Sequence, residues 1–110
     1  MKNPFKNKGL YYEARVAYQL KKQGFAAVSF TKETSDYGTD IVCFDLQGRL
    51  CAIQCKYYNK PVGYEAVEQA FAGANYYNCQ RAMLITNKGF TKNAKHGASV
   101  LGVELYVYSI

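Results

Sequence analysis

The chain has 110 residues, the length of a single domain, and its composition of 49% hydrophobic, 15% aromatic and 20% charged residues excludes intrinsic disorder. No apolar run approaches the ~20 residues that a membrane helix needs, and the first residues lack the apolar segment of a signal peptide, so we expect a cytoplasmic protein with no membrane contact. Lys and Arg number 14 against 8 Asp and Glu, a net charge of +6 that favours a polyanionic partner.

The first two expected elements are a helix and a strand. The helix runs from about Lys8 to Gln23, because Gly24 is a natural C-terminal stop and the two preceding lysines suit the negative end of the helix dipole. The apolar segment from Phe25 to Thr31 predicts a strand, and a polar loop follows it.

A hairpin is expected next, from two strand-like segments, 39–46 and 50–58, that are joined by Gln47, Gly48 and Arg49. The remaining elements are a helix from Tyr64 to Tyr77, a strand from Arg81 to Thr86, a helix capped by Thr91 that runs to about Ser99, and a strand from Val103 to Tyr108.

The resulting order, α-β-β-β-α-β-α-β, predicts an α/β sandwich around a mixed sheet. The first strands form an antiparallel meander, and the helical crossover makes the fourth strand parallel to the third. The four cysteines contain no CxxC pair and His96 is the only histidine, which argues against a zinc site. We interpret the cysteines as small, reduced core residues.

Four polar residues interrupt the apolar pattern of these elements: Glu13, Asp40, Gln54 and Lys56. Glu13 shares the inward stripe of the first helix, and Asp40 opens the second strand. Gln54 and Lys56 point to one face of the third strand, while Cys55 between them points to the other. Each residue alone has an ordinary structural explanation, as a helix-start carboxylate, a turn aspartate or a solvated strand end.

The register of the hairpin decides whether these polar groups meet. A three-residue loop places Val42 opposite Gln54 and Asp40 opposite Lys56, whereas a two-residue loop places Asp40 opposite Cys55 on the other face. We therefore predict the three-residue loop, with Asp40, Gln54 and Lys56 clustered at one end of an apolar face.

Such a cluster suits hydrolysis of a phosphodiester bond with Mg²⁺, for which Mn²⁺ is expected to substitute. Mg²⁺ prefers carboxylates, carbonyl oxygens and waters. Asp40 can supply the carboxylate, Gln54 a neutral side-chain oxygen and Cys55 its backbone carbonyl, while Glu13 can reach the metal through a water. Lys56 can orient the attacking water or stabilise charge in the transition state.

Several short motifs occur in a recognisable order over nearly the whole chain: G-L-Y-Y-E at 9–13, G-F at 24–25, D-Y-G-T-D at 36–40, Q-C-K at 54–56 and I-T-N-K-G-F-T-K-N-A at 85–94. This order resembles the PD-(D/E)XK nuclease superfamily and, within it, the Mrr-like restriction endonuclease catalytic domain. The resemblance implies one domain over residues 1–110, with the restriction-endonuclease-like three-layer sandwich, and a magnesium-dependent endonuclease that cleaves DNA.

The resemblance also implies roles for single residues. Asp40 matches the metal aspartate, Lys56 the catalytic lysine and Glu13 the acidic residue of the first helix. Gln54 stands where most of the superfamily has Glu or Asp, and the loss of one carboxylate weakens metal affinity. Asp36 and Glu65 are the carboxylates available to compensate, although Asp36 also suits a role in shaping its loop and Glu65 a place in the first helical turn.

Two alternative functions stay open. A catalytically inactive DNA-binding module would follow if Gln54 leaves the site without metal. A Holliday junction resolvase shares the fold and the helix glutamate, but such enzymes usually carry Glu at the place of Gln54. The chain is either a stand-alone small nuclease or the catalytic part of a larger protein with a separate DNA-recognition domain.

DNA contacts and self-association are also expected. The residues expected to bind phosphates, around a helix start and along a basic track, are Lys32, Lys60, Lys88, Thr91, Lys92 and Lys95; scattered solubilising lysines are the alternative explanation. Cleaving both strands of a duplex needs two sites, and tyrosines suit interfaces, so we predict a two-fold homodimer. The tyrosines in question, on the second helix and the last strand, are Tyr64, Tyr76, Tyr77, Tyr106 and Tyr108.

Overall fold

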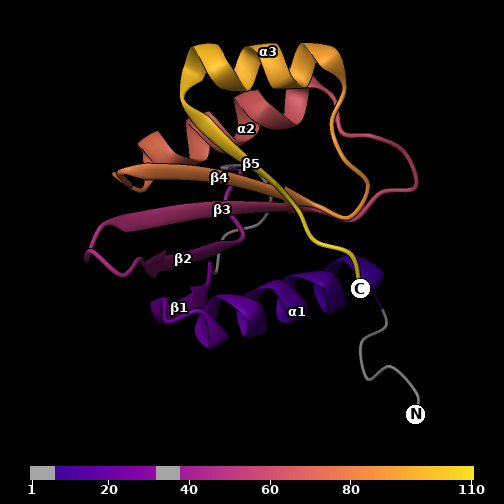
Figure 1. Ribbon diagram of the computed structural model, residues 1–110. Helices are drawn as coiled ribbons and strands as arrows, with labels where there is room; N and C mark the ends of the chain where they lie inside the picture. The colour runs from indigo at the N-terminus through magenta and orange to yellow at the C-terminus, as the bar shows by residue number, and fades with distance from the viewer. Residues whose placement is uncertain (1–6, 32–37) are drawn as a thin grey trace.

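Helices cover both faces of one five-stranded sheet in the computed structural model, which describes residues 7–31 and 38–110 (Figure 1). The elements are α1 (Lys8–Lys22), β1 (Ala26–Phe30), β2 (Ile41–Phe44), β3 (Leu50–Lys56), α2 (Tyr64–Tyr76), β4 (Arg81–Thr86), α3 (Lys92–Leu101) and β5 (Val103–Val107). The predicted order of elements and the three-layer α/β architecture are confirmed. No helix in these two described ranges has the length and apolar character needed to cross a membrane.

The sheet has the spatial order β1-β2-β3-β4-β5. Its first three strands are antiparallel, and β3 and β4, as well as β4 and β5, are parallel. The crossover through α2 therefore sets the fourth strand parallel to the third, as predicted. The carboxyl end of β3 lies in register with that of β4, since Lys56 pairs with Thr86.

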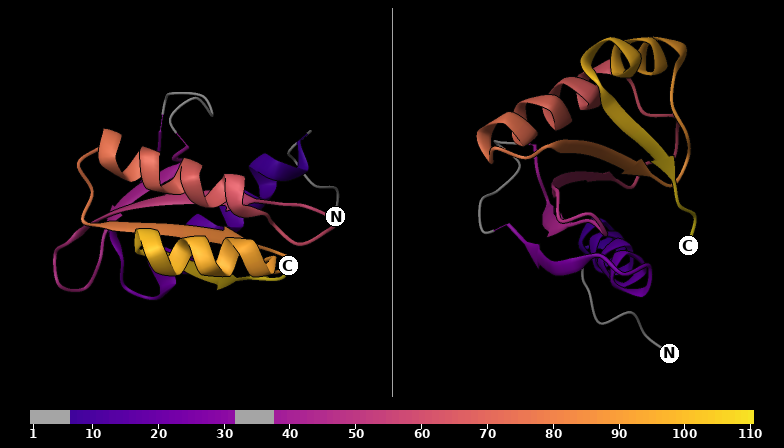
Figure 2. Two further views of the ribbon diagram at one scale, coloured as in Figure 1. Left: turned by 90° about the horizontal axis from the view of Figure 1, so that it is seen from above. Right: turned by 60° about the vertical axis from the view of Figure 1, so that its left-hand side comes forward.

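Two hydrophobic cores lie on opposite faces of the sheet. α1 packs on one face with buried residues that include Tyr12 and Val16. α2 and α3 lie side by side over the other face (Figure 2), where small residues such as Ala66 and Ala70 let α2 approach the strands. The cysteines are free thiols, and three of them, in β2 and β3, are buried, which confirms their interpretation as reduced core residues.

α3 extends two residues beyond its expected end near Ser99. It reaches Leu101 because Gly102 forms the C-cap, with a φ of 75° in the left-handed region that glycine tolerates. The Gly102 N–H donates to the Ala98 carbonyl at 2.8 Å, which satisfies one carbonyl of the last turn.

The predicted hairpin register is wrong by two residues. Phe44 pairs with Leu50 and Val42 with Ala52, so five residues, 45–49, connect the strands. Asp40 directly precedes β2, and its N–H donates to the Ile53 carbonyl at 2.8 Å, so it meets β3 at Ile53 and not opposite Lys56. Because the error is an even number of residues, the predicted faces of the strands are unchanged.

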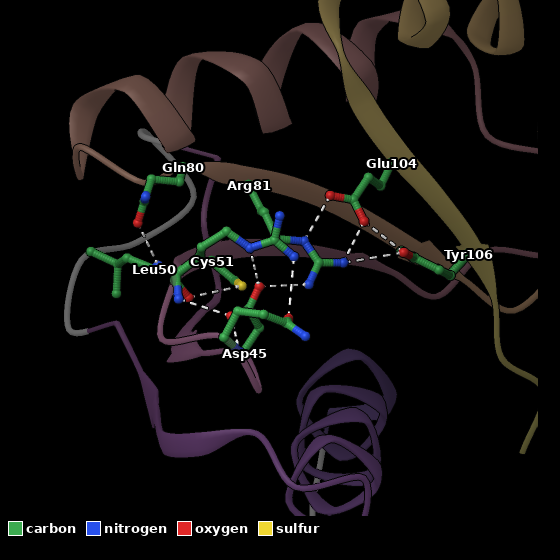
Figure 3. A network of polar contacts seen from close by, with 9 residues as sticks. Asp45, Leu50, Cys51, Gln80, Arg81, Glu104 and Tyr106 are labelled. Carbon is green, nitrogen blue, oxygen red and sulfur yellow. Dashed lines mark hydrogen bonds and ion pairs between the residues drawn. The ribbon is translucent and has the colours of Figure 1, made fainter.

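Asp45 explains the longer connection. Its carboxylate Oδ1 accepts hydrogen bonds from the N–H groups of Gln47 at 2.9 Å and Arg49 at 2.8 Å, so the side chain replaces strand pairing with a capped turn. Oδ2 is bound by Arg49 Nε at 2.7 Å and by Arg81 Nη1 at 3.1 Å, and Arg81 also contacts Glu104 (Figure 3). Burial would raise the pKa of Asp45, but these hydrogen bonds outweigh it and lower that pKa to about 2. The turn is thus fixed by a charged network at the amino ends of β3 and β4.

Candidate active site at the carboxyl end of β3

Asp40 is tied directly to β3. Its Oδ2 accepts a hydrogen bond from the backbone N–H of Cys55 at 2.8 Å. In a strand, the N–H and C=O of one residue face the same neighbour, so the Cys55 carbonyl is on the side of this carboxylate. Burial raises the pKa of Asp40, while the Cys55 hydrogen bond and the positive charge of Lys56 oppose that rise.

Gln54, the residue before Cys55, carries an unused side-chain oxygen. The residue is 4% exposed, and its Oε1 has no hydrogen-bond partner among the described residues. A buried acceptor without a partner costs free energy, so such atoms in native proteins call for an explanation. A ligand that coordinates Oε1 would supply one.

Glu13 approaches from the helix on the other face. The residue is half-buried on α1, and burial together with the charge of Asp40 raises its pKa to about 7. Both carboxylates also raise the pKa of the buried Cys55 thiol, after the larger effect of burial itself. These three residues from α1, the start of β2 and the end of β3 are therefore electrostatic neighbours.

Lys56 is the last residue of β3 and lines a cleft. The cleft has a volume of about 380 Å³ and lies beside the start of α2, where Lys60 and Glu65 also line it. The Lys56 ammonium lies 5.8 Å from the centre of the Tyr58 ring. Lys56 takes part in none of the ion pairs formed within residues 7–31 and 38–110, so its charge is available to a phosphate. Glu65 is exposed in the first turn of α2.

Gly38 brings the turn before Asp40 against α2. It is buried with a φ of 65°, and a Cβ built on it would lie 2.2 Å from the backbone oxygen of Gln69. Only a residue without a side chain fits this contact. The glycine of the D-Y-G-T-D motif thus sets how closely the turn before Asp40 approaches the helix.

Asn87 is a site-building residue that the sequence analysis did not single out. Its side chain accepts from the Tyr58 N–H and donates to the Tyr58 carbonyl, both at 2.8 Å, and so holds the segment that follows Lys56. The residue stands inside the I-T-N-K-G-F-T motif, directly after β4. An amide at a strand end is the only signal for this role, because its partner lies 29 residues away along the chain.

The expected phosphate-binding residues divide into three groups. Lys60 and Lys88 lie on neighbouring loops, which are joined by hydrogen bonds from Val62 N–H to the Gly89 carbonyl at 2.8 Å and from Thr91 N–H to the Val62 carbonyl at 2.9 Å. Thr91 uses its hydroxyl as the N-cap of α3. Lys92 and Lys95 are exposed in the first turns of that helix. Lys32 and Asp36 lie outside the described residues.

The donor set fits a hard divalent cation. No group of three His, Cys, Asp or Glu side chains gathers in the described part of the chain. The available donors are instead the Asp40 carboxylate, the unpartnered Gln54 oxygen and the Cys55 carbonyl, with the Glu13 carboxylate nearby. All are oxygens, which Mg²⁺ and Mn²⁺ prefer over nitrogen or sulfur.

Comparisons with known proteins point to nucleases. A family profile described as restriction endonuclease matches residues 6–107. A search of curated proteins found no match. Among solved structures, a protein of unknown function is 24% identical with a TM-score of 0.70, and the alignment covers 87% of this chain and 56% of that one.

Two endonucleases are among the similar structures. A repair endonuclease from Pyrococcus abyssi is 16% identical, with a TM-score of 0.66 and coverage of 99% of this chain and 50% of that one. EndoMS without ligand is 16% identical, with a TM-score of 0.70 and coverage of 100% and 48%, and its complex with double-stranded DNA gives a TM-score of 0.69. At these identities the likeness is one of fold, and this chain spans about half the length of each structure.

Proposed function

The chain belongs to the restriction endonuclease family, and from this membership we propose that it is a metal-dependent DNA endonuclease that hydrolyses phosphodiester bonds. The observation that carries the proposal is the Asp40 carboxylate bound to the Cys55 N–H, together with the buried side-chain oxygen of the preceding residue, Gln54, which has no partner among the described residues. Lys56 follows in β3 and forms no ion pair within residues 7–31 and 38–110. This is the set of groups that hydrolysis of a phosphodiester requires.

Four residues of this chain would hold the metal. Asp40, Gln54 Oε1 and the Cys55 carbonyl would bind Mg²⁺ or Mn²⁺, and Glu13 would hold a water of its hydration shell. When bound, the ion polarises the phosphate and lowers the pKa of a water. The raised pKa values of Glu13 and Asp40 reflect burial of charge that a cation would compensate.

Lys56 and the loops that carry Lys60 and Lys88 would bind the phosphates of the DNA. The Lys56 ammonium binds a phosphate oxygen in the cleft and stabilises the negative charge that builds up during attack. Lys60 and Lys88 bind flanking phosphates from the two hydrogen-bonded loops. The complex of EndoMS with double-stranded DNA, a protein of similar fold, supports DNA as the substrate.

The test is cleavage of supercoiled, linear, methylated and four-way-junction DNA with Mg²⁺, with Mn²⁺ or with EDTA. We expect metal-dependent nicking by the wild type and none by Asp40→Ala, which should still bind DNA because the lysines remain. Glu65→Ala is the matched control, since it removes an exposed carboxylate from the same cleft and should cleave normally. Nicking by pure Asp40→Ala at the wild-type rate would refute the site.

The same experiment separates the alternatives. Exclusive cleavage of the four-way junction would identify a Holliday junction resolvase. Tight binding without cleavage of any substrate would identify a catalytically inactive DNA-binding module, and would mean that Gln54 leaves the site without an active metal.

We further propose that the catalytic unit is a two-fold dimer, because one site cuts one strand of a duplex. The exposed tyrosines Tyr64, Tyr76 and Tyr106 are available for such an interface. Sedimentation equilibrium at micromolar concentration measures the mass. A monomer that makes double-strand breaks at a rate first-order in protein would contradict the dimer.

A separate DNA-recognition domain, if the chain is part of a larger protein, would supply sequence specificity.

A further inference from the structure

A second surface suited to nucleic acid lies directly behind the catalytic lysine. Tyr57 follows Lys56 and, by strand alternation, points to the face that carries α1. Its ring is 38% exposed. The ring packs on Tyr12, with 5.3 Å between ring centres, and Tyr12 is fully buried with its hydroxyl donating to the Tyr108 carbonyl at 2.7 Å. Tyr57 is therefore an aromatic side chain that is supported by packing on Tyr12 and partly exposed to solvent.

An oriented cation stands beside this ring. Arg15 donates from Nη1 to the Tyr11 hydroxyl at 3.1 Å and from Nη2 to the Tyr108 hydroxyl at 3.4 Å. None of the ion pairs within the described ranges involves Arg15, so no carboxylate there neutralises it. Lys8, two turns earlier on α1, adds a second positive charge on the same stripe of the helix.

These residues surround a small cleft, which we call the tyrosine cleft. It is lined by Lys8, Tyr11, Arg15, Tyr57 and Ile110 and has a volume of about 270 Å³. That is just below the roughly 300–1,000 Å³ of pockets for drug-sized molecules, and so suits a group the size of one nucleobase. An aromatic wall with cations at its rim is the combination with which proteins bind single-stranded nucleic acid.

We propose that the tyrosine cleft binds one unstacked nucleotide near the cleaved bond, so that the preferred substrate is DNA with a single-stranded or distorted segment close to the cut. The inference rests on the proposed nuclease function. Tyr57 directly follows Lys56, and the two side chains point to opposite faces at the same end of the sheet, so a strand held by Lys56 can pass around this end and reach Tyr57. In a regular duplex each base is stacked between its neighbours, and only an unpaired or extruded base can offer its face to Tyr57.

The test compares binding of a labelled single-stranded oligonucleotide with binding of the same sequence as a duplex, by fluorescence anisotropy in EDTA. Tyr57→Ala should weaken single-strand binding at least about fivefold, the loss expected for one stacked base. Its effect on the duplex should be less than twofold, and Tyr57→Phe, which keeps the ring, should bind normally. Tyr18→Ala is the matched control, because Tyr18 is a 56% exposed ring on α1 beside Lys22, outside the tyrosine cleft.

Arg15→Ala gives an independent test at a half-buried position of the tyrosine cleft, and it should also weaken single-strand binding more than duplex binding. Equal loss for both DNA forms, or no loss in either variant, would overturn the inference. Because EDTA prevents cleavage, the outcome does not depend on catalysis. Single-strand binding that needs Tyr57, in a protein that cuts no DNA, would support the tyrosine cleft while rejecting the nuclease. Duplex cleavage without any role for Tyr57 would support the nuclease while rejecting the tyrosine cleft.

Discussion

Gly38 offers a direct test of how the fold builds the site, because the chain contains a matched control. Gly38 and Gly48 both have positive φ angles, 65° and 79°, so alanine at either position costs about 1 kcal/mol of backbone strain. They differ in their surroundings. A Cβ at Gly48 meets nothing within 4 Å, whereas a Cβ at Gly38 would lie 2.2 Å from the Gln69 backbone oxygen.

The contact at Gly38 must open before alanine can fit. Real Cβ atoms essentially never approach within 3.0 Å of another atom, so the turn and α2 must separate by at least 0.8 Å, the difference from 2.2 Å. Overpacking of this kind costs roughly 1–3 kcal/mol. We therefore expect Gly48→Ala to lower the free energy of unfolding by about 1 kcal/mol, and Gly38→Ala to lower it by about 2–4 kcal/mol.

Urea unfolding followed by circular dichroism measures both losses, and plasmid nicking measures activity under conditions where each variant stays folded. Gly38→Ala should also nick more slowly, because Asp40 lies two residues after the displaced backbone, while Gly48→Ala should nick at the wild-type rate. Equal stability losses for the two variants would refute the argument from close approach. A folded Gly38→Ala with full activity would show that the turn does not position Asp40.

Two further predictions concern residues of the proposed metal site. Gln54→Glu should tighten Mg²⁺ binding by about tenfold, because a second carboxylate adds charge for a hard cation, and calorimetric titration decides it; equal or weaker affinity would mean that residue 54 is not a ligand. Glu13→Gln should stabilise the metal-free protein at pH 8 and not at pH 4. The folded-state pKa of about 7 lies above the usual 4.5, so the wild type loses stability as the pH rises between these values. The full difference would be worth about 3 kcal/mol, and partial exposure of the side chain reduces it to about 1.5 kcal/mol. A wild-type melting temperature that stays constant from pH 4 to 8 in EDTA, relative to the variant, would contradict the burial of this charge.

Periodicity was sufficient to predict the elements and the faces of the strands, because hydrophobic residues recur with the period of each element. Pairing was harder to predict. The turn between β2 and β3 depends on Asp45, whose carboxylate binds both Arg49 in the turn and Arg81 at the start of the next parallel strand. No local rule contains a contact across 36 residues. An even slip keeps the side chains of the paired strands on their predicted faces, and Asp40 still meets β3 near its carboxyl end, at Ile53 and Cys55.

Two residues that the sequence did not reveal, Asn87 and Arg15, were missed for the same reason, a contact with a distant part of the chain. Asn87 and Arg15 both act on partners far away in the chain, at Tyr58 and Tyr108. Each is ordinary by type and position, and its contact exists only after the sheet has assembled. Motif order could find the residues expected to perform the chemistry, but not those that hold them in place.

Charged side chains are paired at one end of the sheet and not at the other, within the described residues. This difference argues for a polyanion at the end where they are not paired. The ion pairs among the described residues all lie at the amino ends of β3 and β4, where Asp45 and Glu104 neutralise Arg81 and Arg49 (Figure 3). At the carboxyl end of β3, Lys56 has no such partner within those residues. Charges paired within the protein stabilise its register, whereas the half-buried Lys56 ammonium suits binding of a phosphate and the buried Gln54 oxygen suits binding of a metal ion. Charges at one end of the sheet are thus neutralised by the protein's own side chains, and on our proposal the charge at the other end is neutralised by DNA.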